Sequence, residues 1–364
     1  MSETLRDIVG MRAPAPKNFP KAVPLACPDK TLLMGIELEI EKAYAYDEWG
    51  VAGIEAKDDG SLRDGGKEFI TMPMTYSNLV YCLDLFFNKS KVTAANYSER
   101  CSIHVHANCQ DLTVEQLQTL LILYQTFEGL LFAFEGNNRQ DNIFCVPWSQ
   151  TALTHSLFKD FNNVFKFKRW QKYTALNLLP LMDKGTVEFR HMAGHCNREK
   201  LYAWLRIIGC LFAYARVTPV EALKKTITDL NTNSHYQMFL SSVFGNEFEY
   251  FVALPRFEEV LEQDVLNVKY ALLTSENTKQ DLDMGGVEEY LRTVNRLREQ
   301  ERAIRAMAAQ ERQPAPPTIL PPVNMERQVR ENRVRINQFV AQPVQPNADR
   351  WFAMDLEAGE RNPR

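Results

Sequence analysis

Three glutamates alternate with apolar residues in the segment MGIELEIE, residues 34–41. Side chains of an extended strand point to opposite faces in turn, so four apolar side chains would share one face. Glu37, Glu39 and Glu41 would share the other face, where like charges repel one another. The segment therefore predicts a strand with one buried face. Its acidic face is either solvated or holds a cation between the carboxylates.

The composition is that of an ordinary globular protein. The chain has 364 residues, of which 45% are hydrophobic and 24% charged, so it can build a substantial core. A formal net charge of −4 gives no indication of a nucleic-acid partner. The N-terminus lacks a signal-peptide pattern, and we expect no apolar run near the roughly 20 residues that span a bilayer. We therefore expect a cytoplasmic protein with neither a nucleic-acid nor a membrane partner.

Seven cysteines are scattered along the chain without a CxxC pair. An odd number without pairing motifs favours reduced, partly buried thiols. A zinc site made of Cys101, Cys109, His104 and His106 is a weaker alternative, because these spacings fit no common zinc pattern.

Strand-like and helix-like segments are mixed between residues 32 and 216. The expected strands are Leu32–Glu41, Lys67–Met72, Ser102–Ala107, Tyr173–Leu178 and Thr186–Arg190, and the expected helices are Tyr76–Asn88, Leu112–Phe134 and Leu201–Ala215. Thr113 is a candidate N-cap for the second helix, with Gln116 three residues later. The pattern predicts an α+β fold in which helices cover one face of a mainly antiparallel sheet.

Four regions are expected along the chain. Residues 1–29 form a flexible lead, and residues 30–275 form the main domain, helical after residue 218. Residues 284–312 form a charged helical arm that is either solvated or a contact for self-association. Residues 313–364 begin with a Pro-rich linker, include a second short helix near 326–340, and are otherwise largely disordered.

Four further segments carry ionisable side chains suited to a site. KDDGSL (57–62) is a turn that contains Asp59, and GGKEFIT (65–71) is a strand that carries Glu68. Two histidines, His104 and His106, would share one strand face in CSIHVHANC (101–109). An acid and a base, Glu188 and Arg190, would share one strand face in GTVEFRHMAGH (185–195). Each segment alone has an ordinary structural explanation, such as a structural histidine or a plain salt bridge.

Together these segments predict one polar sheet face. Its side chains would be Glu37, Glu39, Glu68, His104, His106, Glu188 and Arg190. Unpaired carboxylates in a cleft are costly unless cations bind, and oxygen ligands with an imidazole suit Mg²⁺ or Mn²⁺. Arg190 would then face a phosphate, which predicts nucleotide-dependent phosphoryl transfer.

The order GxExE, DGS, a Gly-preceded strand Glu, HxH, ALN and EFR resembles the carboxylate–amine ligase superfamily. Glutamine synthetase and γ-glutamylcysteine synthetase are its familiar members. SIHVHAN is similar to the glutamine synthetase segment in which a metal-binding histidine is followed by a phosphate-contacting histidine. TVEFRH is similar to the glutamine synthetase segment in which a metal-binding glutamate is followed by a phosphate-binding arginine. The chain is most similar to the amidoligase branch known from bacterial and phage genomes. The resemblance covers residues 30–215 and implies a glutamine-synthetase-like catalytic sheet.

The resemblance also implies roles for individual residues. Glu37, His104 and Glu188 would hold one divalent ion. Glu39 would share a second ion with Glu68.

The remaining implied roles concern the nucleotide and the substrates. His106 and Arg190 would contact the ATP phosphates, while Lys172 and Asn177 (from YTALNL, 173–178) are weaker candidates for substrate or phosphate contacts. Asp59 is a candidate for orienting an amine. The further metal glutamates and the ammonium-binding acid of glutamine synthetase have no counterpart that the sequence identifies.

The function implied is an ADP-forming amide-bond ligase that uses ATP and at least two Mg²⁺ or Mn²⁺ ions. A carboxylate would form an acyl phosphate, which an amine then attacks, and either substrate could be an amino acid, a peptide or a protein group. The setting would be the cytoplasm of a bacterium or a phage-infected host. Two alternatives remain: a guanidino-kinase-like phosphotransferase, and a non-catalytic structural protein that retains the fold.

Overall fold

The computed structural model describes residues 3–136, 139–151 and 172–277, together with six single residues between 292 and 303. The chain divides into two compact units, Met1–Arg302 and Ala303–Arg364, and all that follows concerns the first. Apart from those single residues, the predicted arm 284–312 lies outside the described residues. So do the linker, the second helix and the tail within 313–364.

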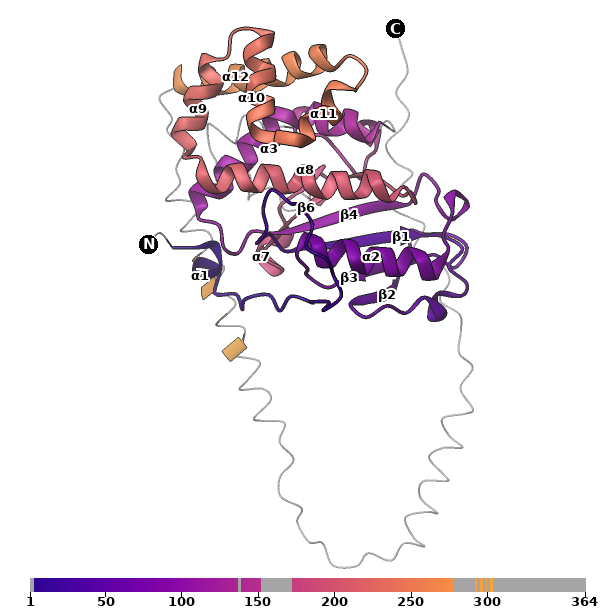
Figure 1. The fold of residues 1–364 in the computed structure, drawn as a ribbon. Coiled ribbons are helices and arrows are strands. Elements are labelled where there is room, and N and C mark those ends of the chain that lie inside the picture. The colour runs from indigo at the N-terminus through magenta and orange to yellow at the C-terminus, as the bar shows by residue number, and fades with distance from the viewer. Residues whose placement is uncertain are drawn as a thin grey trace, which may run out of the picture. The chain divides into compact units, whose positions relative to one another are not determined.

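A six-stranded sheet forms one layer, in the order β2-β3-β1-β4-β6-β5 (Figure 1). Its strands are β1 (Met34–Ile40), β2 (Ile54–Asp58), β3 (Lys67–Thr71), β4 (Ser102–Asn108), β5 (Leu176–Asn177) and β6 (Thr186–Ala193). Every pairing between these strands is antiparallel, which confirms the predicted α+β class. The sequence did not predict β2, an edge strand whose side chains are mostly exposed and give no apolar alternation.

The apolar face of the sheet is the floor of the core, as the opening segment predicts. Met34, Ile36, Leu38 and Ile40 are all at most 1% exposed. Helix α2 (Tyr76–Ser90) contacts β1, and α8 (Arg198–Val217) contacts both α2 and α3. Alternation on β1 therefore assigns one face to the core and leaves the glutamates on the other.

Helix α3 (Val114–Glu135) is the central helix of the fold. Its capping box joins Thr113 and Gln116 reciprocally, as predicted. The expectation that no apolar segment is long enough to span a bilayer is wrong. This 22-residue helix is both long enough and apolar enough to do so. However, 83% of its apolar window is buried inside the protein, where α3 contacts β6, α8 and α12. Its hydrophobicity is therefore that of a core helix.

A second helical layer covers α3 and α8 (Figure 1). It consists of α9 (Val220–Asp229), α10 (Asn233–Phe244), α11 (Phe248–Val252) and α12 (Phe257–Asn277). Phe239, Phe244 and Phe251 are buried there. Tyr250, on the same helix as Phe251, is 40% exposed, and its hydroxyl accepts a hydrogen bond from Arg206.

The N-terminal segment differs from the predicted flexible lead. Residues Leu5–Val9 form α1, with a capping box between Thr4 and Asp7. Leu5, Ile8 and Val9 are each only 2% exposed, since their i, i+3, i+4 spacing gives the short helix one apolar side. Backbone hydrogen bonds from Leu5 and Arg6 also join α1 to the turn after β4.

His191 supplies a pH-dependent test of this core. It is fully buried among Tyr124, Phe132 and Trp204, and burial lowers its pKa to about 3. The unfolded chain therefore binds one more proton than the native protein between pH 6.5 and 3, and stability is lost as the pH falls. We expect the stability advantage of the wild type over His191→Gln to shrink by about 2 kcal/mol between pH 7.5 and 5 in urea titrations. A constant difference would contradict a neutral buried imidazole.

Candidate active site

Strand register alone brings the predicted site residues together. Glu37 on β1 pairs with His104 on β4, and Glu39 pairs with Glu68 on β3. His106 pairs with Glu188 on β6. Directly opposite residues have Cβ atoms about 5 Å apart, so each pair can interact across the sheet. The polar face is therefore built from four adjacent strands that lie far apart in the sequence.

The first group of potential metal ligands consists of Glu37, His106 and Glu188, whose ligand atoms all lie within 4.8 Å of one another. His106 Nε2 lies 3.0 Å from Glu37 Oε1 but, among the described residues, has no hydrogen-bond partner. Its Nδ1 is 3.0 Å from the hydroxyl of Thr186, which orients the ring. A buried ring nitrogen aimed at a carboxylate without a hydrogen bond is the arrangement that a cation between them would satisfy.

His104 lies beside this group and connects it to Glu39. Its Nδ1 is 3.5 Å from Glu37 Oε2 and 3.3 Å from Glu188 Oε1. Its Nε2 is 2.9 Å from the hydroxyl of Ser102, which in turn donates to Glu39 at 2.6 Å. The single hydroxyl proton is used on Glu39, so His104 Nε2 must be the donor to Ser102. Nδ1 therefore faces the two carboxylates, where the sequence predicted a metal ligand.

The second group is formed by Glu39, Asp59 and Glu68, which offer carboxylate oxygens within 4.8 Å of one another. Asp59 thus lies beside two predicted metal ligands. The sequence had instead suggested that Asp59 orients an amine. Burial and the charges of Glu37, Glu39 and Asp59 raise the pKa of Glu68 to about 7. The carboxylates here repel one another, and their clustered negative charge favours binding of an oxygen-seeking cation.

The first group has basic neighbours instead. Although burial raises the pKa of Glu37, the imidazoles of His104 and His106 and the ammonium of Lys184 bring it well below its usual range. Lys184 Nζ lies 3.2 Å from Glu37 Oε1, and its side chain remains 58% exposed. The sequence did not identify Lys184. Its ammonium already occupies part of the space that a cation bound to Glu37 would use.

Arg190 and Asn177 both engage Glu188. The Arg190 guanidinium forms a close ion pair with Glu188 Oε1, and Asn177 Nδ2 donates to Oε2 at 2.6 Å. The pairing of β4 with β6 shifts between Val105 and Ile103, so two β6 residues face the single position of His104. Such a bulge changes the direction of the side chains on its strand.

The hydrogen bond from Asn177 holds Glu188 in position. The predicted contact of Asn177 with a substrate or phosphate stays a prediction.

Other candidates have different surroundings. The ammonium of Lys172 lies 5.6 Å from the ring centre of Tyr173 and makes no ion pair with the acidic side chains in the described part of the chain. Glu41 accepts a hydrogen bond from the backbone of Arg63 and belongs to neither ligand group. Cys101 and Cys109 also belong to neither group, and burial raises the pKa of both thiols. The weaker zinc alternative thus gains no support.

The polar face is less open than the sequence predicted. The sequence indicated a free, concave floor, but Glu37, Glu39, His104, His106 and Glu188 are only 4–9% exposed. Neighbouring side chains such as Ser102, Asn177 and Lys184 fill the space between them. Glu68 and Asp59 are half-buried, so the second group is the more accessible of the two.

A cavity of about 820 Å³ lies near the residues where β4 begins and β6 ends. Its lining includes Tyr97, Arg139, His195 and Asn197. Ala193 also lines the cavity and pairs with Ser102, the residue that holds Glu39. Cavities of this size accommodate small-molecule substrates.

Period-two alternation could have identified two of the residues that the sequence analysis missed. Ser102 precedes His104 by two positions and Thr186 precedes Glu188 by two, so each shares the polar face of its strand. Lys184 gives no such signal, because the turn between α7 (Pro180–Asp183) and β6 determines where its side chain lies.

Residues 68–209 match the family model described as "Putative amidoligase enzyme". This match confirms the resemblance to the amidoligase family and indicates an amide-bond-forming ligase. No curated protein matches the chain. The match begins at Glu68 and includes β4, β5 and β6, so Glu37, Glu39 and Asp59 lie outside it. The strand register joins these three acids to the matched segment.

The crowded second group predicts an effect of pH on stability in EDTA. An acid with a raised pKa in the native state favours folding below its unfolded pKa of about 4.5, and this contribution is lost as the pH rises through about 7. We therefore expect Glu68→Gln to gain stability relative to wild type between pH 5 and 8, measured by chemical denaturation. If the difference between the two proteins is the same at both pH values, Glu68 is not crowded by its neighbours.

Proposed function

We propose that the protein is an ATP-dependent carboxylate–amine ligase that forms an amide through an acyl phosphate. The main support is the meeting, on one sheet face, of two ligand groups with an arginine at their edge, within and beside the segment that matches the amidoligase family. No nucleophilic side chain is needed for this chemistry, which depends on positioning and charge. The raised pKa values of the buried cysteines make a thiolate mechanism unfavourable.

The donor atoms fit divalent cations. Glu37, His106 and Glu188, with His104 alongside, would hold one ion, and Glu39, Asp59 and Glu68 would hold another. Three carboxylates suit Mg²⁺ or Mn²⁺, and an added imidazole favours Mn²⁺ at the first group. Such ions screen the repulsion between a carboxylate and a triphosphate and stabilise charge on the transferring phosphoryl group.

The chain's own residues would perform the first step by orientation and charge. A substrate carboxylate oxygen forms a bond to the γ-phosphorus, the bond from that phosphorus to the β–γ bridging oxygen breaks, and ADP leaves. Arg190 would turn from Glu188 toward the γ-phosphoryl oxygens, which its planar guanidinium can bind in pairs. Asn177 and Thr186 would keep Glu188 and His106 oriented during this exchange.

The second step joins the amine to the activated carboxylate. The amine nitrogen attacks the acyl carbon, the bond from that carbon to the phosphate oxygen breaks, and the nitrogen loses a proton as phosphate leaves. The cavity lined by Ala193, the strand partner of Ser102, is large enough for an acceptor the size of an amino acid or a peptide end.

Nucleotide binding should depend on Glu37. Glu37→Gln should abolish Mg²⁺-dependent ATP binding in calorimetry, because it removes a charged ligand of the first group without changing volume. The matched control is Glu41→Gln, on the same strand face but outside both groups, which should bind like wild type. EDTA should remove binding in all proteins. Equal binding by wild type and Glu37→Gln would refute the assignment of the site to this face.

Product analysis then separates the ligase from the alternative phosphotransferase. With hydroxylamine as a trapping amine, a ligase gives a hydroxamate and ADP in equal amounts, whereas a phosphotransferase gives a stable phosphorylated product and no hydroxamate. Turnover of neither kind, in a protein that binds MgATP, would favour a structural role.

Lys184→Met supplies another test, in the absence of nucleotide. The lysine ammonium competes with a cation for Glu37, so its removal should tighten Mn²⁺ binding by several-fold, read from the signal of free Mn²⁺ in paramagnetic resonance. Lys184→Arg, which keeps the charge, serves as the control and should bind Mn²⁺ like wild type. Weaker Mn²⁺ binding by Lys184→Met would instead mean that the lysine orders the site.

A further inference from the structure

Two partly exposed aromatic side chains lie beside the polar face and have no role in the ligand groups. Phe144 is 50% exposed and Tyr173 is 38% exposed, and their ring centres are 5.6 Å apart at an angle of 64°. The neighbouring Ile143 is 73% exposed. Clustered apolar side chains on a polar surface often mark a binding site. We call Phe144 and Tyr173 the aromatic pair.

Backbone hydrogen bonds hold the two segments that carry the aromatic pair. Val146 donates to the carbonyl of Tyr173, and Ala175 donates back to that of Val146, each at 2.8 Å. The amide of Phe144 is held by the side chain of Asn142. The rings are thus presented on a fixed scaffold, so their ordering adds little to the entropic cost of binding a flat ligand.

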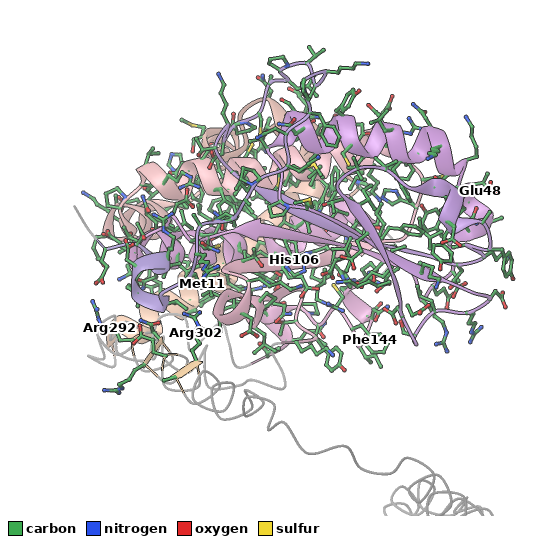
Figure 2. All side chains as sticks on the ribbon, turned by 90° about the horizontal axis from the view of Figure 1, so that it is seen from below. Met11, Glu48, His106, Phe144, Arg292 and Arg302 are labelled. Carbon is green, nitrogen blue, oxygen red and sulfur yellow. The ribbon has the colours of Figure 1, made fainter. Side chains whose placement is uncertain are left out.

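The aromatic pair is attached directly to the charged site. Arg190 Nε donates to the carbonyl of Phe144 at 3.1 Å, while its other end binds Glu188. The backbone of Arg190 donates to Ala175, two residues beyond Tyr173. Figure 2 shows His106 near the middle of the sheet and Phe144 toward the lower margin of the molecule. One arginine therefore spans the region between the ligand groups and the aromatic pair.

The charges around the aromatic pair suit an anionic ligand with a flat ring. The Lys172 ammonium lies 5.6 Å from the ring centre of Tyr173, and the guanidinium of Arg190 donates to the backbone carbonyl of Phe144. Aromatic faces bind nucleobases by stacking with little dependence on base identity, and cations beside them bind phosphates. A nucleotide is the ligand class that uses both features together.

We propose that the aromatic pair binds the purine base of the nucleotide whose phosphates lie at Arg190 and the ligand groups. This inference rests on the proposed function, since it places the base of the same ATP. Phe144 and Tyr173 supply stacking surface, Lys172 lies near the α-phosphate or ribose end, and Arg190 binds the γ-phosphoryl oxygens at the other end of the triphosphate. This arrangement assigns the predicted Lys172 contact to the α-phosphate or ribose end of the nucleotide.

The test compares MgATP with magnesium tripolyphosphate, which has the phosphates without the base. Binding of both ligands is measured by calorimetry for wild type, Phe144→Ala and Tyr173→Ala. Phe144→Tyr and Tyr173→Phe keep the rings. Tyr270→Ala is the matched control, because Tyr270 is a 66% exposed aromatic residue on α12, away from the sheet. Each alanine variant should bind MgATP about tenfold or more weakly and tripolyphosphate like wild type.

Each result has a definite meaning. Wild-type affinity in the ring-keeping variants and in Tyr270→Ala, with selective loss in the two alanine variants, supports the base site. Equal loss of both ligands would overturn it, because the variants would then have disturbed Arg190. Unchanged MgATP binding would also overturn it, and would leave the aromatic pair to another partner such as a protein surface. If wild type binds tripolyphosphate but gains nothing from the base, the inference fails and the proposed function stands. If wild type binds neither ligand, both fail.

Discussion

The pairing of β1 with β3 on one side and β4 on the other is the constraint on which the site depends. Glu37 and Glu39 are two residues apart on one strand, so they point the same way, but each faces a different neighbour. Glu37 meets histidines and Glu39 meets acids. Two chemically distinct ligand groups therefore arise from one short segment, because a central strand has two partners.

Burial makes this arrangement demanding. Several ionisable side chains are taken out of water together, which is favourable only if each finds a partner of opposite charge or a hydrogen bond. The first group has Lys184, Arg190 and two imidazoles, so its carboxylates stay ionised. In the second group, burial and the neighbouring carboxylates raise the pKa of Glu68 instead. The protein thus holds one group with basic partners beside one in which the carboxylates repel one another.

The sequence predicted the fold and the chemical character of the site well where alternation was strong. The alternation predicts which face is buried and which is polar in three segments, MGIELEI, SIHVHAN and TVEFR. In the structure these three strands are neighbours in the sheet. It predicted less where side chains are exposed or short. β2 has too few apolar residues to be recognised, and α1 is a single turn and a half whose burial depends on residues more than 100 positions away. Lys184 reaches Glu37 only because a turn after α7 points it there, and no local pattern encodes that direction.

The hydroxyl of Ser102 makes the two ligand groups communicate. It has one hydrogen, which it gives to Glu39, and this fixes which nitrogen of His104 carries the ring proton. A ligand that draws Glu39 away would free that hydrogen, and the imidazole next to Glu37 and Glu188 could then exchange its tautomer. If cations bind at both groups as proposed, occupancy at one would affect the other through the rotation of a single bond. Loading of the site would then be a linked equilibrium, in which the affinity of each group depends on the occupancy of the other.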